Sequence, residues 1–161
     1  KYHIALLIGY CDGLTDQVQA GELVNIINEK LEDSEVSPDG NVQSLYQIGL
    51  MDSTAFPHLR GGFINMTNAY FNVFLDIKKV ASISSSVLYK GKCDALSDRI
   101  EKHKISVQSR NGLGFVYPCL WNQQPFYHLR LIQYEVITQT HEERPAEKLG
   151  QQIDEILNLI K

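Results

Sequence analysis

The sequence predicts one α+β domain over residues 1–161, with a mainly antiparallel sheet flanked by about three helices. The chain has the length of a single domain. Its 43% hydrophobic and 21% charged residues are the proportions of an ordinary globular protein. Segments with the two-residue alternation of strands lie between segments with the spacing of helices, and this mixture favours helices layered on a sheet.

The first quarter of the chain predicts an apolar segment, a helix and a turn. Residues 4–8 form a continuous apolar run that fits either a buried strand or a buried helical turn. Residues 15–31 predict a helix, because Thr15 suits the N-cap and apolar side chains recur at helical spacing after it. Gly21 weakens this helix by about 1 kcal/mol relative to alanine. Residues 37–41 have the proline and glycine of a turn.

The middle of the chain predicts strands and one short helix. Residues 70–80 form the clearest strand, because Phe71, Val73 and Leu75 alternate with other side chains. A short helix is expected over residues 93–104. The remaining expectations are a strand at 42–51, a loop at 53–62 and a segment at 83–89 that continues the clearest strand or pairs with it.

The last third predicts a hairpin and an amphipathic helix. Residues 115–120 and 126–138 are expected to pair across a polar tip at 122–125. Residues 145–160 predict a helix that begins at Pro145. Because an isolated helix of this length is marginal in water, its apolar stripe must dock on its own sheet or on a neighbouring subunit. The stripe consists of Leu149, Ile153, Ile156, Leu157 and Ile160.

Charge is segregated along the chain, although the net charge is only −4. Residues 12–52 carry nine acids and one base, a net of −8, whereas residues 78–110 carry eight bases and three acids, a net of +5. A mildly acidic chain has no electrostatic footprint for general nucleic-acid binding. The two segments either neutralise each other within one chain or meet on neighbouring subunits.

Cysteines and histidines predict neither a metal site nor a cofactor. The three cysteines form no Cys-x-x-Cys pair, which argues against a disulfide framework and favours a reducing compartment. The five histidines show none of the short spacings of metal ligands. No apolar run reaches the roughly 18 residues of a membrane span, and no signal peptide is evident. A cytoplasmic or virion-associated protein is expected.

One short pattern carries possible catalytic chemistry. Pro38-Asp39 followed by Asp76-Ile77-Lys78 resembles the PD-(D/E)xK nuclease pattern. The resemblance implies that Asp39 and Asp76 hold a divalent cation while Lys78 positions the attacking water. The pattern departs from the family at Asp39, which lies in a predicted turn rather than at the start of a strand.

The favoured hypothesis is a non-enzymatic structural or assembly subunit that contacts copies of itself or other protein subunits, without a membrane partner and without catalytic residues. Its size and mixture of elements are similar to those of tail-terminator and neck proteins of tailed phages. The alternatives are the metal-dependent nuclease and a small-ligand or regulatory binding module. The expected interface residues are Trp121, Gln123, Gln124, Phe126 and Tyr127 at the hairpin, and Ile153 on the last helix.

Overall fold

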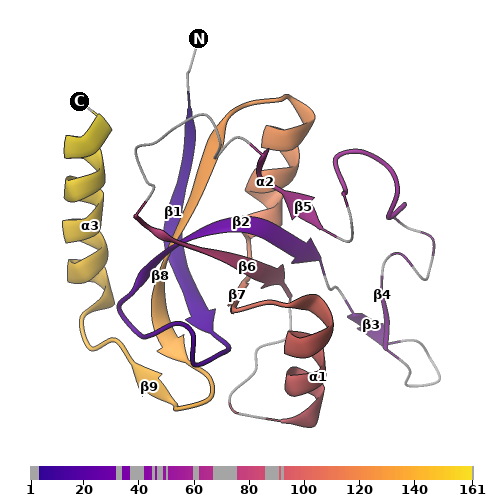
Figure 1. Cartoon of the computed structure of the whole chain (residues 1–161), viewed down its shortest axis with the longest axis horizontal. Helices are drawn as coiled ribbons and strands as arrows, with labels where there is room; N and C mark the ends of the chain where they lie inside the picture. The colour runs from indigo at the N-terminus through magenta and orange to yellow at the C-terminus, as the bar shows by residue number, and fades with distance from the viewer. Residues whose placement is uncertain are drawn as a thin grey trace.

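The computed structural model describes residues 4–31, 34–36, 42–44, 46, 49, 51–59, 62–66, 76–85, 91 and 93–160, and the structural statements below concern these residues. Figure 1 shows the arrangement of their strands and helices. In chain order the elements are β1 (Ala5–Gly13), β2 (Leu23–Leu31), β3 (Ser34–Val36), β4 (Val42–Ser44), β5 (Phe63–Ile64), β6 (Lys78–Ser84), α1 (Asp94–His103), β7 (Val107–Ser109), α2 (Gly112–Trp121), β8 (Phe126–Glu135), β9 (Thr140–His141) and α3 (Pro145–Ile160).

The main sheet is mixed and closes into a barrel. Its seven strands follow the order β5-β2-β6-β7-β1-β8-β9, and β2 also pairs with β8, which closes the ring β2-β6-β7-β1-β8. The long ladders of β1 with β8 and of β2 with β6 are parallel, whereas β2 with β8 and β1 with β7 are antiparallel. The α+β class is therefore confirmed, and the expectation of a mainly antiparallel sheet is corrected to a mixed one.

The helix expected at residues 15–31 is wrong, because this segment holds turns followed by β2. Gly21 has φ +82°, a left-handed conformation that ends any helix there, and its amide donates to the carbonyl of Ile132. The following Val-Asn-Ile-Ile run is rich in β-branched residues, and β2 lies between β6 and β8. A strand paired on both edges and covered on both faces shows no strict alternation, which explains the misinterpretation.

The expected hairpin is also wrong, because residues 112–121 form α2 instead of a strand. The apolar side of this helix packs Val116 and Cys119 against Phe63 and Phe126 in one core cluster. A run of apolar residues without charges fits a buried strand and a buried helix equally well, and the tertiary packing decides between them. The helices expected at 93–104 and 145–160 are confirmed as α1 and α3.

Other expectations fall only partly on the described residues. Among the described residues, the strand expected at 42–51 is limited to β4, because residues 46 and 49 lie in turns. Of the strand expected at 70–80, β6 begins only at Lys78 after a turn at residue 76, and residues 70–75 lie outside the described part. The turn at 37–41 lies outside it as well. The loop expected at 53–62 is confirmed where it is described: turns and a bend lead to an isolated bridge between Leu59 and Gly62.

The strands separate an interior face from an outer face. Along β8, Tyr127 and Leu129 lie outside and pack on Ile156 of α3, so this helix docks on its own sheet. The alternate residues Phe126 and Ile132 belong to two different core clusters. Between these two lie the polar side chains of His128 and Arg130.

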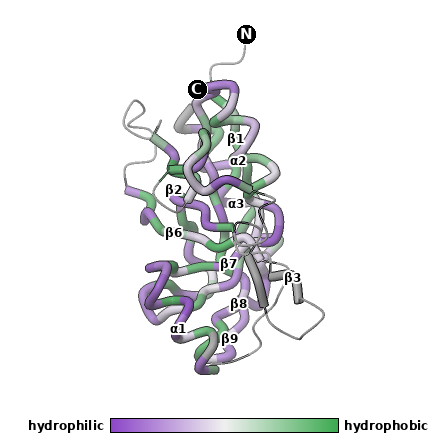
Figure 2. Tube along the Cα trace, turned by 90° about the vertical axis from the view of Figure 1, so that its right-hand side faces the viewer, coloured by the Kyte–Doolittle hydropathy of each residue, from purple (hydrophilic) through white to green (hydrophobic). Residues whose placement is uncertain are grey.

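The remaining helix, α1, covers the other side of the sheet through Leu96, which packs with Ile83 of β6. Most of its residues are hydrophilic, as Figure 2 shows for the tube of α1. No helix of the described residues is long and apolar enough to cross a membrane.

Candidate functional site

The ends of β1, β7 and β8 surround a cleft of about 340 Å³. Polar side chains dominate its lining, and they come from strands that are remote in sequence but adjacent in the sheet. β1 and β8 run parallel with Gly9 opposite Arg130, so residues 7–12 of β1 lie beside Arg130 and Gln133 of β8. The lining consists of Leu7, Ile8, Gly9, Tyr10, Cys11, Asp12, Gln108, Ser109, Arg110, Asn111, Arg130 and Gln133.

Asp12 is the single carboxylate among the described residues that line this cleft. Its Oδ1 accepts a hydrogen bond of 3.2 Å from the Gln133 amide, and its Oδ2 accepts one of 3.3 Å from the Gln108 amide. The β1–β8 register shifts between Cys11 and Asp12, so that one extra residue, Gln133, turns towards the carboxylate. The side-chain amides of Gln108 and Gln133 hold the carboxylate in place while the cleft remains open beside it.

Arg130 is the buried cation of the cleft, with only 3% of its surface exposed. Its Nε donates to His128 Nε2 at 2.7 Å, and one terminal nitrogen donates to Asn111 Oδ1 at 2.7 Å. The other terminal nitrogen donates to the Tyr10 carbonyl at 3.4 Å. Gly9 leaves the space for this guanidinium, because a Cβ there would collide with it. Burial lowers the pKa of Arg130.

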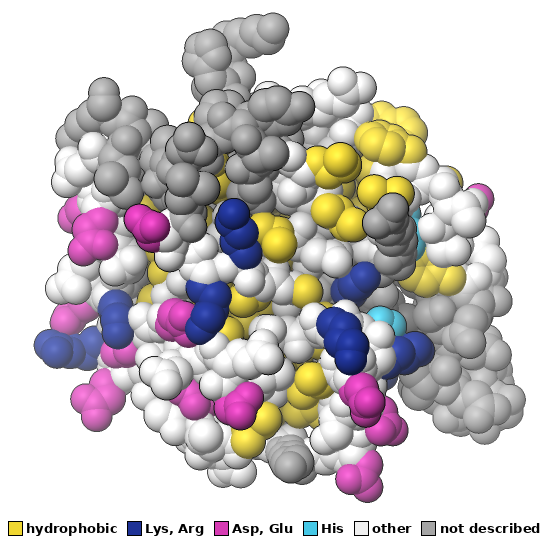
Figure 3. All heavy atoms as spheres, viewed as in Figure 1, with side chains coloured by type: hydrophobic (Ala, Val, Ile, Leu, Met, Phe, Trp, Pro, Cys, Tyr) yellow, Lys and Arg dark blue, Asp and Glu magenta, His cyan; other side chains and the backbone are white. Residues whose placement is uncertain are grey.

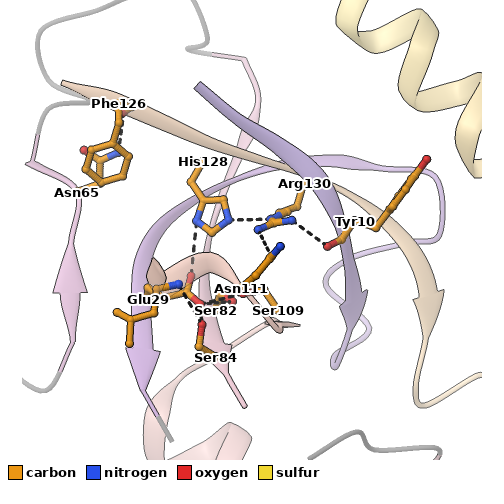
Figure 4. A network of polar contacts seen from close by, with 11 residues as sticks. Tyr10, Glu29, Asn65, Ser82, Ser84, Ser109, Asn111, Phe126, His128 and Arg130 are labelled. Carbon is orange, nitrogen blue, oxygen red and sulfur yellow. Dashed lines mark hydrogen bonds and ion pairs between the residues drawn. The ribbon is translucent and has the colours of Figure 1, made fainter. Parts of the chain in front are cut away.

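Behind Arg130 a buried polar network extends into the barrel (Figure 4). Glu29 Oε1 accepts hydrogen bonds from the hydroxyls of Ser84 at 2.6 Å, Ser109 at 2.9 Å and Ser82 at 3.3 Å. Its Oε2 lies 3.6 Å from His128 Nδ1. Burial raises the pKa of Glu29, and the serine hydrogen bonds oppose that rise. Each of the strands β2, β6, β7 and β8 contributes to this network.

His128 is neutral in this network. Burial, and then the positive charge of Arg130, lower the pKa of His128 to about 3. The ring is fully enclosed and stands between a carboxylate and a guanidinium. The strand expected at 126–138 places His128 inside a sheet, and the structure adds its two neighbours, Glu29 and Arg130.

The residues of the nuclease pattern do not build this site. Asp76 is exposed in the turn before β6, and Asp39 lies outside the described residues. Lys78 lies 2.9 Å from Glu22 Oε1 and donates to the Gln17 carbonyl. Within the described part of the chain, no three His, Cys, Asp or Glu side chains gather in a way that holds a metal ion. The Lys78–Glu22 pair also joins the basic and acidic segments within one chain.

The expected interface residues divide into surface and core. Trp121 is 57% exposed and stacks on Tyr117, with Phe56 nearby. Figure 3 shows hydrophobic side chains gathered over the α2 and β5 end of this face. Phe126 and Tyr127 are fully buried, so their expected place at a hairpin tip is corrected to the core. Of the three remaining expected interface residues, Gln123 is exposed in the turn after α2. Gln124 and Ile153 are both half-buried.

Glu29, His128, Arg130 and Asp12 are not predicted as a group from the sequence. Glu29 had been placed on a helix, and Asp12 between two expected elements. One pattern in the sequence could have indicated two of the four, His128 and Arg130: residues 126–132 alternate Phe-His-Arg-Ile on one face with Tyr-Leu-Leu on the other. Two adjacent polar positions between apolar ones on the inner face of a strand indicate a buried polar site.

Comparison with known proteins gives a fold without a sequence family. No family model and no curated protein matches the sequence. The fold is similar to that of solved structures described as futalosine hydrolase of Helicobacter pylori (TM-score 0.68, 15% identity, 98% of this chain and 66% of that one) and 5′-methylthioadenosine nucleosidase of Arabidopsis thaliana (0.58, 15%, 99% and 62%). It is also similar to the P knowlesi homolog of P falciparum PNP (0.62, 13%, 95% and 60%).

At these identities the likeness concerns the fold alone, and the chain spans about two thirds of the length of the structures it matches. The likeness nevertheless overturns the expectation of a structural subunit similar to phage tail or neck proteins, because the matching folds are those of nucleosidases and hydrolases. The architecture-level analogy was wrong because it rested on size and on a sheet of the wrong topology.

Proposed function

We propose that this chain binds a nucleoside in the cleft between β1, β7 and β8 and hydrolyses its N-glycosidic bond. The observation that carries the proposal is the convergence of one carboxylate, Asp12, and one buried guanidinium, Arg130, on a single polar cleft. The volume of about 340 Å³ is within the range of small-molecule sites. Solved structures with this fold are described as nucleosidases and hydrolases, which supports the choice of substrate class.

The reaction assigns a separate task to each group. The bond between the sugar C1′ and the base nitrogen breaks, and the oxygen of a water molecule forms the new bond to C1′. Asp12 accepts one proton from that water and then releases it to solvent. The leaving base takes the electron pair of the broken bond and one proton from solvent, so the net reaction is nucleoside plus water giving free sugar plus free base. Arg130 donates hydrogen bonds to acceptor atoms of the bound molecule, which fixes its orientation relative to the carboxylate.

The test is base release by the full chain. The protein is incubated with adenosine, inosine and 5′-methylthioadenosine, and the free base is measured by reverse-phase chromatography, while calorimetry measures binding of each nucleoside. Asp12→Asn keeps the shape of the side chain but removes the proton acceptor, so base release should fall by roughly 100-fold or more. Asp16→Asn, at an exposed position in the adjoining turn, is the matched control and should leave base release unchanged.

Three outcomes decide the proposal. Base release that Asp12→Asn abolishes and Asp16→Asn preserves supports hydrolysis at this cleft. Binding without base release retains the nucleoside site and overturns the hydrolytic step. If the native chain neither binds nor cleaves any of the three nucleosides, the proposal is wrong.

A further inference from the structure

A continuous series of polar contacts runs from the centre of the barrel to the cleft. It begins at the three serine hydroxyls on Glu29 and passes through His128 to Arg130. Glu29, His128 and Arg130 are 1%, 0% and 3% exposed, so solvent does not compete for their hydrogen bonds. Buried charged groups without partners are costly, and an arrangement of this kind in a barrel interior indicates a specific task.

The hydrogen bond from Arg130 fixes the tautomer of His128. Arg130 Nε carries a proton and lies 2.7 Å from His128 Nε2, so this ring nitrogen accepts and carries no proton. A neutral imidazole then bears its proton on Nδ1, the atom that lies 3.6 Å from Glu29 Oε2. The hydrogen bond from Arg130 thus sets the tautomer. Glu29 favours the same tautomer through its charge across 3.6 Å, since neither Glu29 Oε2 nor His128 Nδ1 has a hydrogen-bond partner among the described residues.

The same contacts fix the guanidinium. Arg130 has five N–H donors, and its bonds to His128, Asn111 and the Tyr10 carbonyl use three of them. Two donors remain, on a side chain that lines the cleft. A guanidinium held at Nε and at both terminal nitrogens presents its free donors in one orientation.

We propose that Glu29 and His128 are positioning residues for Arg130, and that Arg130 donates its two remaining hydrogen bonds to the molecule bound in the cleft. The inference rests on the proposed function for the identity of that molecule. The positioning itself depends only on this chain. The ionisable groups that face the series are Glu29 from β2, Arg130 from β8, and Cys11 of β1 beside the guanidinium.

The first measurement reads the tautomer directly. Long-range ¹H–¹⁵N correlation spectra of the native protein distinguish a protonated Nδ1 from a protonated Nε2. His128 should show the Nδ1–H form, constant between pH 5 and pH 8, because burial and Arg130 hold the pKa of His128 at about 3. An Nε2–H form, or a titration within this range, would overturn the inference whether or not any nucleoside binds.

The second measurement compares two substitutions at the same position. In His128→Gln the amide oxygen accepts from Arg130 Nε, whereas His128→Leu offers no acceptor. The Arg130 Nε–H signal should stay protected from exchange with water in the native protein and in His128→Gln, and should lose that protection in His128→Leu. Equal protection in the two variants would overturn the positioning role. Thermal unfolding of each variant reports separately any loss of fold.

The third measurement concerns the bound molecule, with 5′-methylthioadenosine as the probe. Its affinity should fall roughly tenfold or more in His128→Leu, and much less in His128→Gln, because only the first releases a charged hydrogen-bond donor. His141→Gln, at an exposed position on β9, is the control and should bind as the native protein does. Equal affinities in all four proteins would overturn the role of Arg130 in binding. Absence of binding to the native chain would overturn the nucleoside site and leave the spectroscopic result to decide the positioning.

Discussion

Gly112→Ala tests whether the buried polar network is as tightly packed as the structure indicates. Gly112 is the first residue of α2 and faces the barrel interior. A Cβ at this position would lie 2.6 Å from His128 Cε1, 2.8 Å from Ser109 Oγ and 2.9 Å from Glu29 Cδ. All three atoms belong to the network, and none of them is the free end of a flexible surface side chain. The methyl group therefore requires that the network shift.

The expected loss of stability follows from two contributions. Overpacking of a well-packed interior costs about 1–3 kcal/mol. Displacement of Ser109 or His128 also weakens a hydrogen bond to a charged group, worth about 1.5–3 kcal/mol. The helix preference of alanine returns less than about 1 kcal/mol at this terminal position. Because the displaced hydrogen bond is weakened rather than lost, only part of its value is forfeited. The free energy of unfolding should therefore fall by roughly 2–4 kcal/mol, which corresponds to a decrease in Tm of about 5–15 °C for a chain of this length.

Urea denaturation followed by circular dichroism measures this change. Gly114→Ala is a matched control in the same helix, since a Cβ at Gly114 has no other atom within 4 Å. The control should be unchanged or up to about 1 kcal/mol more stable, because alanine favours the helix. If Gly112→Ala proves as stable as Gly114→Ala, the interior has room beside Glu29 and His128. Arg130 would then not be held rigidly by its neighbours.

Three further predictions concern α3, the pH dependence of stability and the aromatic residues near α2. Ile156→Asp should destabilise the protein by at least about 3 kcal/mol in thermal unfolding, whereas Leu157→Asp, at a half-exposed position, should change stability by less than about 1 kcal/mol; equal effects would mean that α3 does not dock as described. The pKa of His128 is about 3 in the folded chain and 6.5 without burial, so the unfolded chain binds more protons between these values and stability falls as the pH falls through this window. Relative to His128→Gln, the native protein should lose about 1.4 kcal/mol per pH unit below pH 6 in denaturant titrations, and parallel curves for the two proteins would contradict this. Phe126→Ala should lower the free energy of unfolding by about 3–5 kcal/mol, and Trp121→Ala should lower it by less than about 1 kcal/mol. The reverse order would contradict the burial of Phe126.

Local patterns in the sequence were sufficient to predict the helices and strands that have one apolar face. In α1, Leu96 is buried among mostly hydrophilic neighbours, and α3 follows Pro145 with a regular apolar stripe, so both helices could be predicted near their observed bounds. The strand character of β8 was predictable for a similar reason, since its segment is rich in aromatic and branched side chains. In each of these elements the residues that decide the conformation are close together in the sequence.

The elements covered on several sides could not be predicted in this way. Residues 23–31 carry apolar side chains at helical spacing, but pairing with β6 and β8 makes them the strand β2. Residues 115–120 are apolar without a clear period, and contact with Phe63 and Phe126 makes them part of the helix α2. Propensity contributes a few tenths of a kcal/mol per residue, and burial of whole side chains outweighs it.

Local sequence patterns were enough to predict the α+β class and two of the three helices, but they did not identify His128 and Arg130 as parts of one site. Strand pairing is what brings Glu29 of β2 beside His128 and places Asp12 of β1 in the same cleft as Arg130. The physical reason is that ladder hydrogen bonds join strands far apart in the chain, and closure of β2 on β8 encloses side chains from four strands in one interior. The periodicity of a single segment does not predict which strand will pair with it.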